Sequence, residues 1–324
     1  MKNEKIKWGI LGLGKIAGKF ARGLEHIDGS ELYAVASRSI SKAKEFAREF
    51  PEARPYGSYE EMLKDENIDV IYIATPHVFH LEHSLLSLKH DKAVLCEKPF
   101  ALNTSQVEEM ITMAKNKDLF LMEAMWTQFL PHFKFVKQVI ESGKYGKIRN
   151  LKANFGFEAP VDYNKRLYNK ALGGGSLLDI GIYPVFMALS LLGEPEKFQA
   201  KAEFSKTGID QHCDIIFEYP GGTEAKLQSS IVKKTDTAAK IVLEKATITL
   251  NSRFHEPTSV TISTAEGEEI KEFETSGNGY NFEAEHVERM LREGRKESTE
   301  MTFEKSLSLI RHLDMIRNKI DLDY

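Results

Sequence analysis

The first 125 residues alternate short, strongly apolar runs with stretches that carry the pattern of an amphipathic helix, and this alternation limits the possible folds more than any other feature. The apolar runs are β-rich and occupy residues 7–11, 32–36, 70–74, 93–96 and 119–122. Between two of them, Ala43, Phe46, Ala47 and Phe50 recur at the spacing that gives a helix one apolar stripe. Strands with no polar face that alternate with helices are typical of a parallel sheet covered on both sides. We therefore predict a doubly wound α/β domain of the Rossmann type over residues 1–125.

The pattern changes beyond residue 125, where strand-like runs follow one another directly. They lie at residues 148–157, 198–205, 214–219, 224–231, 240–243, 247–251, 260–263 and 270–273. Short joins such as Pro220-Gly221-Gly222 suit hairpins, so the sheet should be mainly antiparallel. Helical patterns lie at residues 132–142, 176–192, 282–293 and 303–320. Residues 126–324 should therefore form an α+β domain with an open, mainly antiparallel sheet.

Composition excludes several classes of partner. The formal net charge of −4 over 324 residues offers no basic excess for nucleic acid or an anionic membrane. No apolar run approaches the ~20 residues of a membrane span, and the first residues lack the pattern of a secretory signal. Cys96 and Cys213 cannot form a disulfide framework, and no histidine or carboxylate spacing suggests a metal site. We expect a cytoplasmic protein that binds a small molecule.

A glycine loop follows the first predicted strand and opens the first predicted helix, with the form Gly12-x-Gly14-x-x-Ala17. Gly12 would allow a tight turn, Gly14 would let the backbone approach a pyrophosphate, and Ala17 would let helix and strand pack closely. Lys15 and Ile16 complete the loop, whose N–H groups and helix dipole favour phosphate. A tight strand–helix turn without a ligand has the same glycines. The position of the loop in a repeated strand–helix pattern favours a dinucleotide.

The end of the second predicted strand bears on which dinucleotide binds. An acidic residue about twenty residues beyond the loop would bind the ribose hydroxyls of NAD, but Ser37 and Arg38 stand there instead. Arg38 can bind a phosphate through two hydrogen bonds, Ser37 can donate one, and Lys42 adds charge one turn later. We predict NADP as the cofactor, with NAD as the alternative if Arg38 is only a solvated surface residue.

Two further motifs accompany the glycine loop, and together they resemble the glucose–fructose oxidoreductase / inositol dehydrogenase (Gfo/Idh/MocA) superfamily. The motifs are Gly12-x-Gly14-x-x-Ala17, Glu97-Lys98-Pro99 and Gly173-Gly174-Gly175-Ser176-x-x-Asp179-x-Gly181-x-Tyr183. Residues 56–61, 93–99, 121–127 and 178–183 resemble most closely the branch of dimeric dihydrodiol dehydrogenases and NADP-linked D-xylose 1-dehydrogenases. The resemblance implies hydride transfer on a sugar or a related diol. It also implies a homodimer formed through the C-terminal sheet.

Lys98, Asp179 and Tyr183 are the predicted catalytic residues. Hydride transfer from a carbinol needs a group that takes the hydroxyl proton. Lys98 follows an apolar strand at the end where ligands bind in open α/β sheets, although an ion pair with Glu97 is the structural alternative. Asp179 and Tyr183 are four residues apart, so a helix would place them on one face. We predict that Tyr183 is the general acid/base, that Lys98 lowers its pKa, and that Asp179 positions a neighbouring hydroxyl. Whether Tyr183 or Lys98 moves the proton is left open.

Supporting cofactor residues are implied by the same resemblance. Thr75-Pro76-His77, at the end of the third apolar run of the first domain, resembles a turn that contacts the cofactor. His80 is either a second cofactor contact or a structural, hydrogen-bonded histidine. Glu97 belongs to the cofactor set through its motif with Lys98.

The substrate pocket is expected to include Trp126, Phe155 and Arg166 together with Asp179 and Tyr183. Without the resemblance, the two aromatic residues would be read as ordinary core residues. The leading hypothesis is an NADP(H)-dependent oxidoreductase of an aldose such as D-xylose or of a cyclic trans-diol. The alternatives are an inositol or other sugar-alcohol dehydrogenase that uses NAD, and a dinucleotide-binding regulator without activity.

Overall fold

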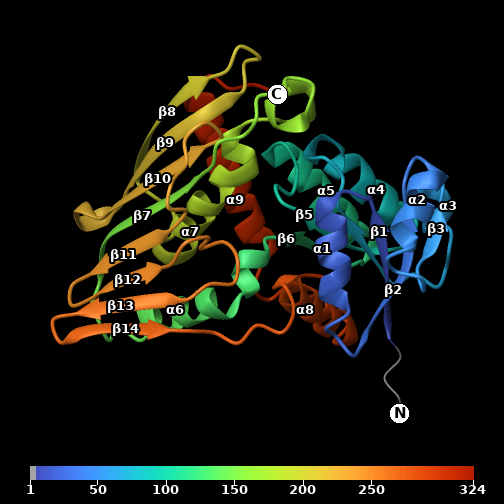
Figure 1. Cartoon of the computed structure of the whole chain (residues 1–324), viewed down its shortest axis with the longest axis horizontal. Helices are drawn as coiled ribbons and strands as arrows, with labels where there is room; N and C mark the ends of the chain where they lie inside the picture. The colour runs from blue at the N-terminus through green and yellow to red at the C-terminus, as the bar shows by residue number, and fades with distance from the viewer. Residues whose placement is uncertain (1–4) are drawn as a thin grey trace. The chain divides into compact units, whose positions relative to one another are not determined.

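The computed structural model describes residues 5–324, which form two compact units (Figure 1). The first unit comprises the described residues up to Phe129 together with Thr275–Leu307, and the second comprises Leu130–Glu274 and Ser308–Tyr324. The linear division at residue 125 predicted from the sequence assigns residues 275–307 to the second domain, whereas in the structure they pack with the first.

The first unit contains the predicted doubly wound parallel sheet, with the strand order β3-β2-β1-β4-β5-β6. Its strands are β1 (Ile6–Leu11), β2 (Ser30–Ala36), β3 (Arg54–Tyr56), β4 (Val70–Ile73), β5 (Ala93–Glu97) and β6 (Leu121–Ala124). Every pair of neighbouring strands is parallel. All residues of β4 and β5 are buried, as the apolar runs at residues 70–74 and 93–96 predict, and Glu97 at the end of β5 is buried with them. The sequence pattern does not predict β3, because it has only three residues and holds Pro55, which an edge strand tolerates.

Helices cover both faces of this sheet because the strand order reverses at β1. The chain runs from β1 to β3 in one direction along the sheet and from β4 to β6 in the other. Because each crossover is right-handed, the helices of the two halves lie on opposite faces. These helices are α1 (Lys15–Leu24), α2 (Ile40–Ala47), α3 (Tyr59–Leu63), α4 (His80–Lys89) and α5 (Thr104–Lys117). Side-chain oxygens of Ser58 and Asn103 accept N–H groups in the first turns of α3 and α5, at 3.1 and 3.0 Å. The reversal point between β1 and β4 is where open α/β sheets bind ligands.

Helix α8 (Tyr280–Arg292) returns to the first unit late in the sequence. Its Glu288 accepts hydrogen bonds from the Trp8 indole, at 3.0 Å, and from the hydroxyl of Ser30. At the start of α8, the Tyr280 ring stacks on Trp126 with the ring centroids 4.2 Å apart. The first unit is therefore assembled from two segments that are distant in sequence.

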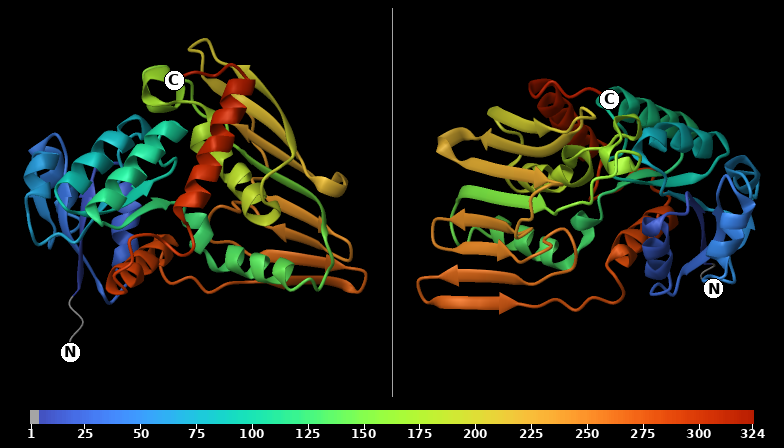
Figure 2. Two further views of the ribbon diagram at one scale, coloured as in Figure 1. Left: turned by 180° about the vertical axis from the view of Figure 1, so that it is seen from behind. Right: turned by 45° about the horizontal axis from the view of Figure 1, so that its top comes forward.

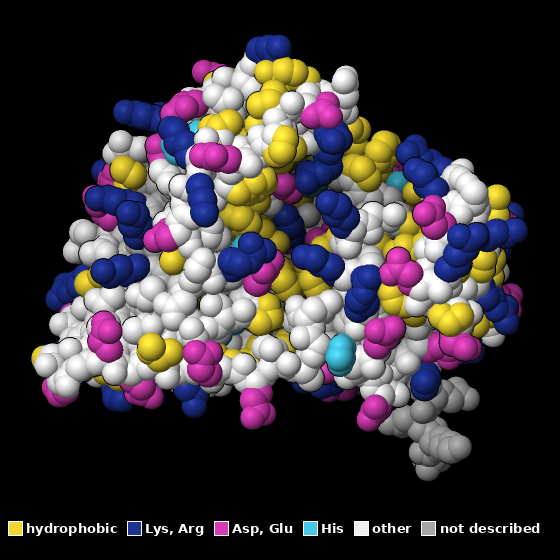
Figure 3. Space-filling view, viewed as in Figure 1, with side chains coloured by type: hydrophobic (Ala, Val, Ile, Leu, Met, Phe, Trp, Pro, Cys, Tyr) yellow, Lys and Arg dark blue, Asp and Glu magenta, His cyan; other side chains and the backbone are white. Residues whose placement is uncertain are grey.

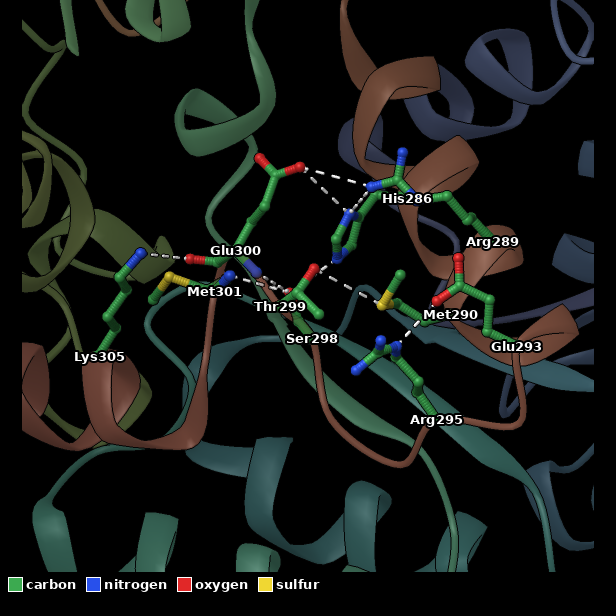
Figure 4. A network of polar contacts seen from close by, with 10 residues as sticks. All are labelled: His286, Arg289, Met290, Glu293, Arg295, Ser298, Thr299, Glu300, Met301 and Lys305. Atoms are coloured by element: carbon green, nitrogen blue, oxygen red, sulfur yellow. Dashed lines mark hydrogen bonds and ion pairs between the residues drawn. The ribbon is translucent and has the colours of Figure 1, made fainter. Parts of the chain in front are cut away.

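A polar network fixes the loop that follows α8 (Figure 4). His286 Nε2 lies 2.8 Å from Ser298 Oγ, and Arg289 joins His286 to Glu300. A serine, a histidine and an acid also make up hydrolase triads. Here the side chain of Ser298 is buried, and its hydroxyl accepts the backbone N–H groups of Glu300 and Met301. The network therefore holds a turn and offers no accessible nucleophile.

The second unit is built on an eight-stranded sheet with the order β14-β13-β12-β11-β7-β10-β9-β8. Its strands are β7 (Ile148–Gly156), β8 (Lys197–Phe204), β9 (Asp210–Glu218), β10 (Glu224–Ser230), β11 (Ala239–Leu243), β12 (Thr247–Leu250), β13 (Val260–Thr264) and β14 (Gly267–Lys271). Only the β7–β10 pair is parallel among these strands, so the predicted open, mainly antiparallel sheet is confirmed.

One face of this sheet is covered by α6 (Pro131–Glu141), α7 (Ile182–Leu192) and the part of α9 (Phe303–Lys319) that belongs to the second unit (Figure 2). The segment Lys170–Leu192 is long and apolar enough to cross a membrane, but it is mostly buried, as in the core helix of a globular domain. Lysine and arginine side chains are interspersed with aspartate and glutamate on the molecular face in Figure 3, in keeping with the small net charge.

Candidate active site

The glycine loop lies at the reversal point of the first sheet, and packing requires small residues at two of its three motif positions, Gly12 and Ala17. Gly12 has a φ of +92°, and a Cβ there would lie 2.6 Å from the Thr75 side chain. Gly14 precedes α1, where a Cβ would meet nothing within 4 Å. Ala17, in the first turn of α1, is fully buried. No described side chain caps α1 and its first turn holds no acid, so the N–H groups at its start fit the pyrophosphate of a dinucleotide. Lys15 and Ile16 form the first turn.

A cavity of about 320 Å³ lies beside the loop, and Arg38 is one of its walls. Thr75, Pro76, Phe79 and His83 line it too, as do residues 57–60 and Glu82. The Arg38 guanidinium lies 5.9 Å from the centre of the Phe79 ring. Burial lowers the pKa of His83 to about 4, and the charge of Arg38 adds to this, so His83 is neutral near pH 7. The cavity therefore combines flat apolar walls with an arginine, but the carboxylates of Glu60 and Glu82 also border it.

Two of the predicted cofactor residues around Arg38 lie outside this cavity lining. Lys42 is exposed on α2. Ser37 is half-buried, and its hydroxyl accepts the Ser39 N–H at 3.4 Å.

The histidines after β4 are buried. Both ring nitrogens of His80 lie 2.8 Å from backbone carbonyl oxygens, those of Pro99 and Thr75, and this links the loops that follow β4 and β5. Burial lowers the pKa of His80 to about 4 although both carbonyl contacts favour the charged ring. The His77 ring lies 6.0 Å from the ring of His80. These contacts fit the structural role that the sequence left open for His80.

Lys98 follows β5, and a buried carboxylate anchors its backbone. Glu97 Oε2 accepts the Lys98 N–H at 3.2 Å, and the Tyr72 hydroxyl also bonds to the Glu97 carboxylate. Glu283 of α8 is fully buried nearby, and neither of its carboxyl oxygens has a hydrogen-bond partner among the described residues. Burial first, and then the charge of Glu97, raises the pKa of Glu283 well above its usual range. Neither Tyr72 nor Glu283 can be predicted from the sequence, since nothing in a strand or helix pattern shows that they lie close to Glu97.

In the second unit, Asp179 and Tyr183 lie on a helix that changes its winding. Residues Leu177–Gly181 form a π-helical turn, and α7 continues from Ile182. Such turns are frequent at functional sites. The Arg166 guanidinium donates to Asp179 Oδ1 at 3.0 Å, so two residues predicted separately for the substrate pocket are directly bonded.

Aromatic rings surround Tyr183. The centre of its ring lies 5.9 Å from that of Phe155 and 4.9 Å from that of His255, and these two rings stack 4.2 Å apart. No motif or periodic pattern marks His255, a single histidine in a loop. The second unit thus gathers Phe155, Arg166, Asp179 and Tyr183, whereas Lys98 and Trp126 belong to the first unit.

These features agree with known families. Residues 6–125 match the family described as an oxidoreductase family with an NAD-binding Rossmann fold, and residues 133–249 match the GFO/IDH/MocA C-terminal domain. The trans-1,2-dihydrobenzene-1,2-diol dehydrogenase of Xenopus tropicalis is 36% identical, over 98% of this chain and 99% of its own. The enzyme of that name from Homo sapiens is 35% identical, over 98% of both chains.

Solved structures show the same fold. A 3-ketoreductase from Actinomadura kijaniata in complex with NADP and TDP-benzene has a TM-score of 0.88 at 25% identity, over 98% of both chains. An aldose-aldose oxidoreductase from Caulobacter crescentus, complexed with glycerol, has a TM-score of 0.89 at 22% identity, again over 98% of both chains. The chain therefore belongs to the Gfo/Idh/MocA family of oxidoreductases and carries its NAD(P)-binding Rossmann domain.

Proposed function

We propose that the protein is an NADP(H)-dependent dehydrogenase that transfers a hydride between the nicotinamide and a carbinol or carbonyl carbon. Its substrate would be an aldose such as D-xylose or a cyclic trans-diol. The observation that carries this proposal is the bonded pair Arg166–Asp179 one helical turn before Tyr183, in a chain whose full-length relatives are named as dehydrogenases of a trans-diol. Adjacent hydroxyls are common to sugars and diols, and this arrangement can address two of them.

The proposed roles follow from the chemistry of each side chain. The Tyr183 side chain, as the phenolate, accepts the proton of the reacting hydroxyl and becomes the neutral phenol as the hydride leaves the carbon, and Lys98 donates a hydrogen bond to the same oxygen. Asp179 accepts a hydrogen bond from the neighbouring hydroxyl, and Arg166 keeps its carboxylate in place. An oxidised nicotinamide held at the glycine loop would supply the hydride acceptor. In the reverse direction Tyr183 returns the proton to the carbonyl oxygen.

The preference for NADP is proposed from the Arg38 cavity. An arginine can neutralise a 2′-phosphate through two hydrogen bonds, and no acidic residue ends β2 to bind free ribose hydroxyls. The 3-ketoreductase of the same fold was solved with NADP.

The reaction is tested by measuring reduction of NADP⁺ and of NAD⁺ with a panel of aldoses, inositols and trans-diols. We expect turnover of at least one aldose or trans-diol, with a higher kcat/KM for NADP⁺. Equal use of both cofactors would contradict the role of Arg38, and a preference for inositols with NAD⁺ would favour the sugar-alcohol alternative. Tight NADPH binding without any turnover would identify a regulator.

The assignment of the proton-transfer residues is tested with Tyr183→Phe and Lys98→Met. Loss of a general acid/base costs about 10²- to 10⁴-fold in rate. We expect kcat to fall by that order in both variants while NADPH still binds, as measured by fluorescence titration. Tyr163→Phe, at an exposed tyrosine of the same unit as Tyr183, is the matched control and should retain normal rates. Near-normal rates in both test variants would refute the scheme.

A further inference from the structure

The last described residue, Tyr324, is bonded to the glycine loop that precedes the π-helical turn. Its hydroxyl donates to the Gly174 carbonyl oxygen at 2.6 Å. The Arg317 guanidinium lies over its ring at 5.3 Å from the centroid, and Arg317 is itself bonded to Asp314 at 2.5 Å. The ring is thus held from α9, and the hydroxyl reaches a segment 150 residues earlier in the chain.

The glycine loop is tightly enclosed on its other sides. Gly174 N–H donates to the Asn169 carbonyl at 3.0 Å, and Gly175 N–H donates to the Leu167 carbonyl at 2.9 Å. Gly175 has a φ of +123°, and a Cβ there would lie 2.2 Å from Asp210 Oδ1 and 2.9 Å from the Tyr324 hydroxyl. The loop therefore lies between the turn that contains Arg166 on one side and Asp210 with Tyr324 on the other.

Asp210 connects this loop to the helix that bears Asp179. It is fully buried on β9, and its Oδ2 accepts both the Ser176 hydroxyl and the Leu177 N–H at 2.7 Å. Leu177 is the first residue of the π-helical turn, so Asp210 fixes where the turn begins. Asp210 and Tyr324 together hold the loop immediately before the site.

Arg166 and Asp179 lie on the two arms of the same loop, one before and one after Gly173–Ser176, and they are bonded to each other. A shift of Gly174 would move these arms relative to one another. It would also move Tyr183, which continues the helix from Asp179. Small displacements of reacting groups can cost about 10²-fold in rate, because catalysis depends on close alignment.

We propose that Tyr324 is a positioning residue for the active site, acting through its hydrogen bond to Gly174 on the placement of Arg166, Asp179 and Tyr183. This inference rests on the proposed function of that site. It assigns a role in substrate turnover to a side chain that lies outside the family motifs.

The test compares Tyr324→Phe with the parent enzyme. This variant keeps the ring beneath Arg317 and removes only the hydroxyl. We expect kcat/KM for the hydroxylated substrate to fall about tenfold or more. The Kd for NADPH should stay within about twofold, because the predicted cofactor residues belong to the other unit. A Tyr324→Ala variant should show a larger loss of kcat/KM, again with an unchanged Kd for NADPH.

Tyr219→Phe is the matched control. Tyr219 is also buried in the second unit, but its hydroxyl has no hydrogen-bond partner among the described residues. Its rates should equal those of the parent. A thermal melt of each variant separates loss of fold from loss of positioning, because a purely structural Tyr324 would lower Tm and leave kcat/KM of the folded enzyme unchanged.

Tyr183→Phe, measured in parallel, distinguishes the two hypotheses. If Tyr183→Phe is impaired and Tyr324→Phe has normal kcat/KM, the positioning role is refuted and the proposed function stands. If Tyr183→Phe has normal rates, the proposed function itself fails. Loss of NADPH binding in folded Tyr324→Phe would also contradict the inference, since the loss would then arise outside the Gly174 loop.

Discussion

Arg38 is the residue on which the proposed preference for NADP mainly rests. It borders a cavity lined by Pro76 and Phe79 and also by Glu60 and Glu82, next to the glycine loop, where the adenosine end of a dinucleotide would lie. We expect Arg38→Ala to raise KM for NADP⁺ by about 10- to 100-fold, since hydrogen bonds to charged groups contribute about 1.5–3 kcal/mol. KM for NAD⁺ should change by less than about threefold. Steady-state kinetics with both cofactors measures the difference.

Lys42→Ala is the control for general loss of positive charge. Lys42 is exposed on α2 and does not line the cavity, so its removal should raise KM for NADP⁺ only slightly. Equal weakening of NADP⁺ and NAD⁺ by Arg38→Ala would mean that Arg38 packs on the adenosine without discriminating the 2′-phosphate.

Residues whose role is local could be predicted from the sequence, and residues defined by distant contacts could not. Gly12 and Ala17 were predicted because turn geometry and close packing restrict those positions to small side chains, and Gly14 was predicted because a bound pyrophosphate needs open backbone there. Asp210 and Tyr324 lie on ordinary strand and terminal segments, and only the fold brings them to the Gly173–Ser176 loop. A sequence pattern reports the face on which a side chain lies but not what it meets there.

At the scale of elements, the helix from residue 176 was predicted, but its π-helical first turn was not. Periodicity cannot separate one π turn from an α-helix. The π-helical turn packs closely against β10 at Gly181, where a Cβ would lie 2.8 Å from Ser229 Oγ. The turn is further fixed at its start by the buried carboxylate of Asp210.

Asp210 gives this element a pH dependence with a definite sign. Burial raises its pKa from 3.8 to about 6 although its hydrogen bonds act in the opposite direction. The folded state therefore holds this proton more tightly than the unfolded state, and the contribution of Asp210 to the free energy of unfolding falls as pH rises from about 4 to about 6. Asp210→Asn cannot ionise, and its amide oxygen can still accept from Ser176 and Leu177. We expect the variant to gain stability relative to the parent across that window, by at most about 3 kcal/mol, and the difference to stay constant above it.

Urea denaturation at a series of pH values measures this difference. Other buried acids, such as Glu123 with a pKa raised to about 7 mainly by burial, titrate in both proteins and cancel. Asp236→Asn, at an exposed aspartate of the same unit, should show no such trend. A pH-independent difference for Asp210→Asn would mean that the carboxyl is not proton-linked to folding in this range.

At the scale of the whole chain, the two fold classes were predicted, but the path of the chain between the two units was not. The amphipathic pattern of residues 282–293 predicts a helix, and α8 occupies Tyr280–Arg292. Such a pattern shows that one face of the helix is buried, but it does not show which of the two units the face packs against. In the structure this face meets Trp8 and Trp126 in the first unit.

The discontinuous first unit leads to a prediction about fragments. Residues 1–129 alone would leave the Trp8 indole without Glu288 and the Trp126 ring without Tyr280. They would also expose the edge of β6, where Leu121 pairs with Glu297, and a bare sheet edge promotes aggregation. We expect this fragment to aggregate or to unfold without cooperativity.

Residues 1–129 joined by a flexible linker to residues 275–307 should unfold cooperatively and bind NADPH, as followed by circular dichroism and fluorescence titration. A Glu288→Ala change in the linked fragment should lower its stability by about 1–3 kcal/mol, because it leaves the buried Trp8 donor unpaired. Cooperative folding and full NADPH affinity of residues 1–129 alone would show instead that the late segment only covers a unit that is already complete.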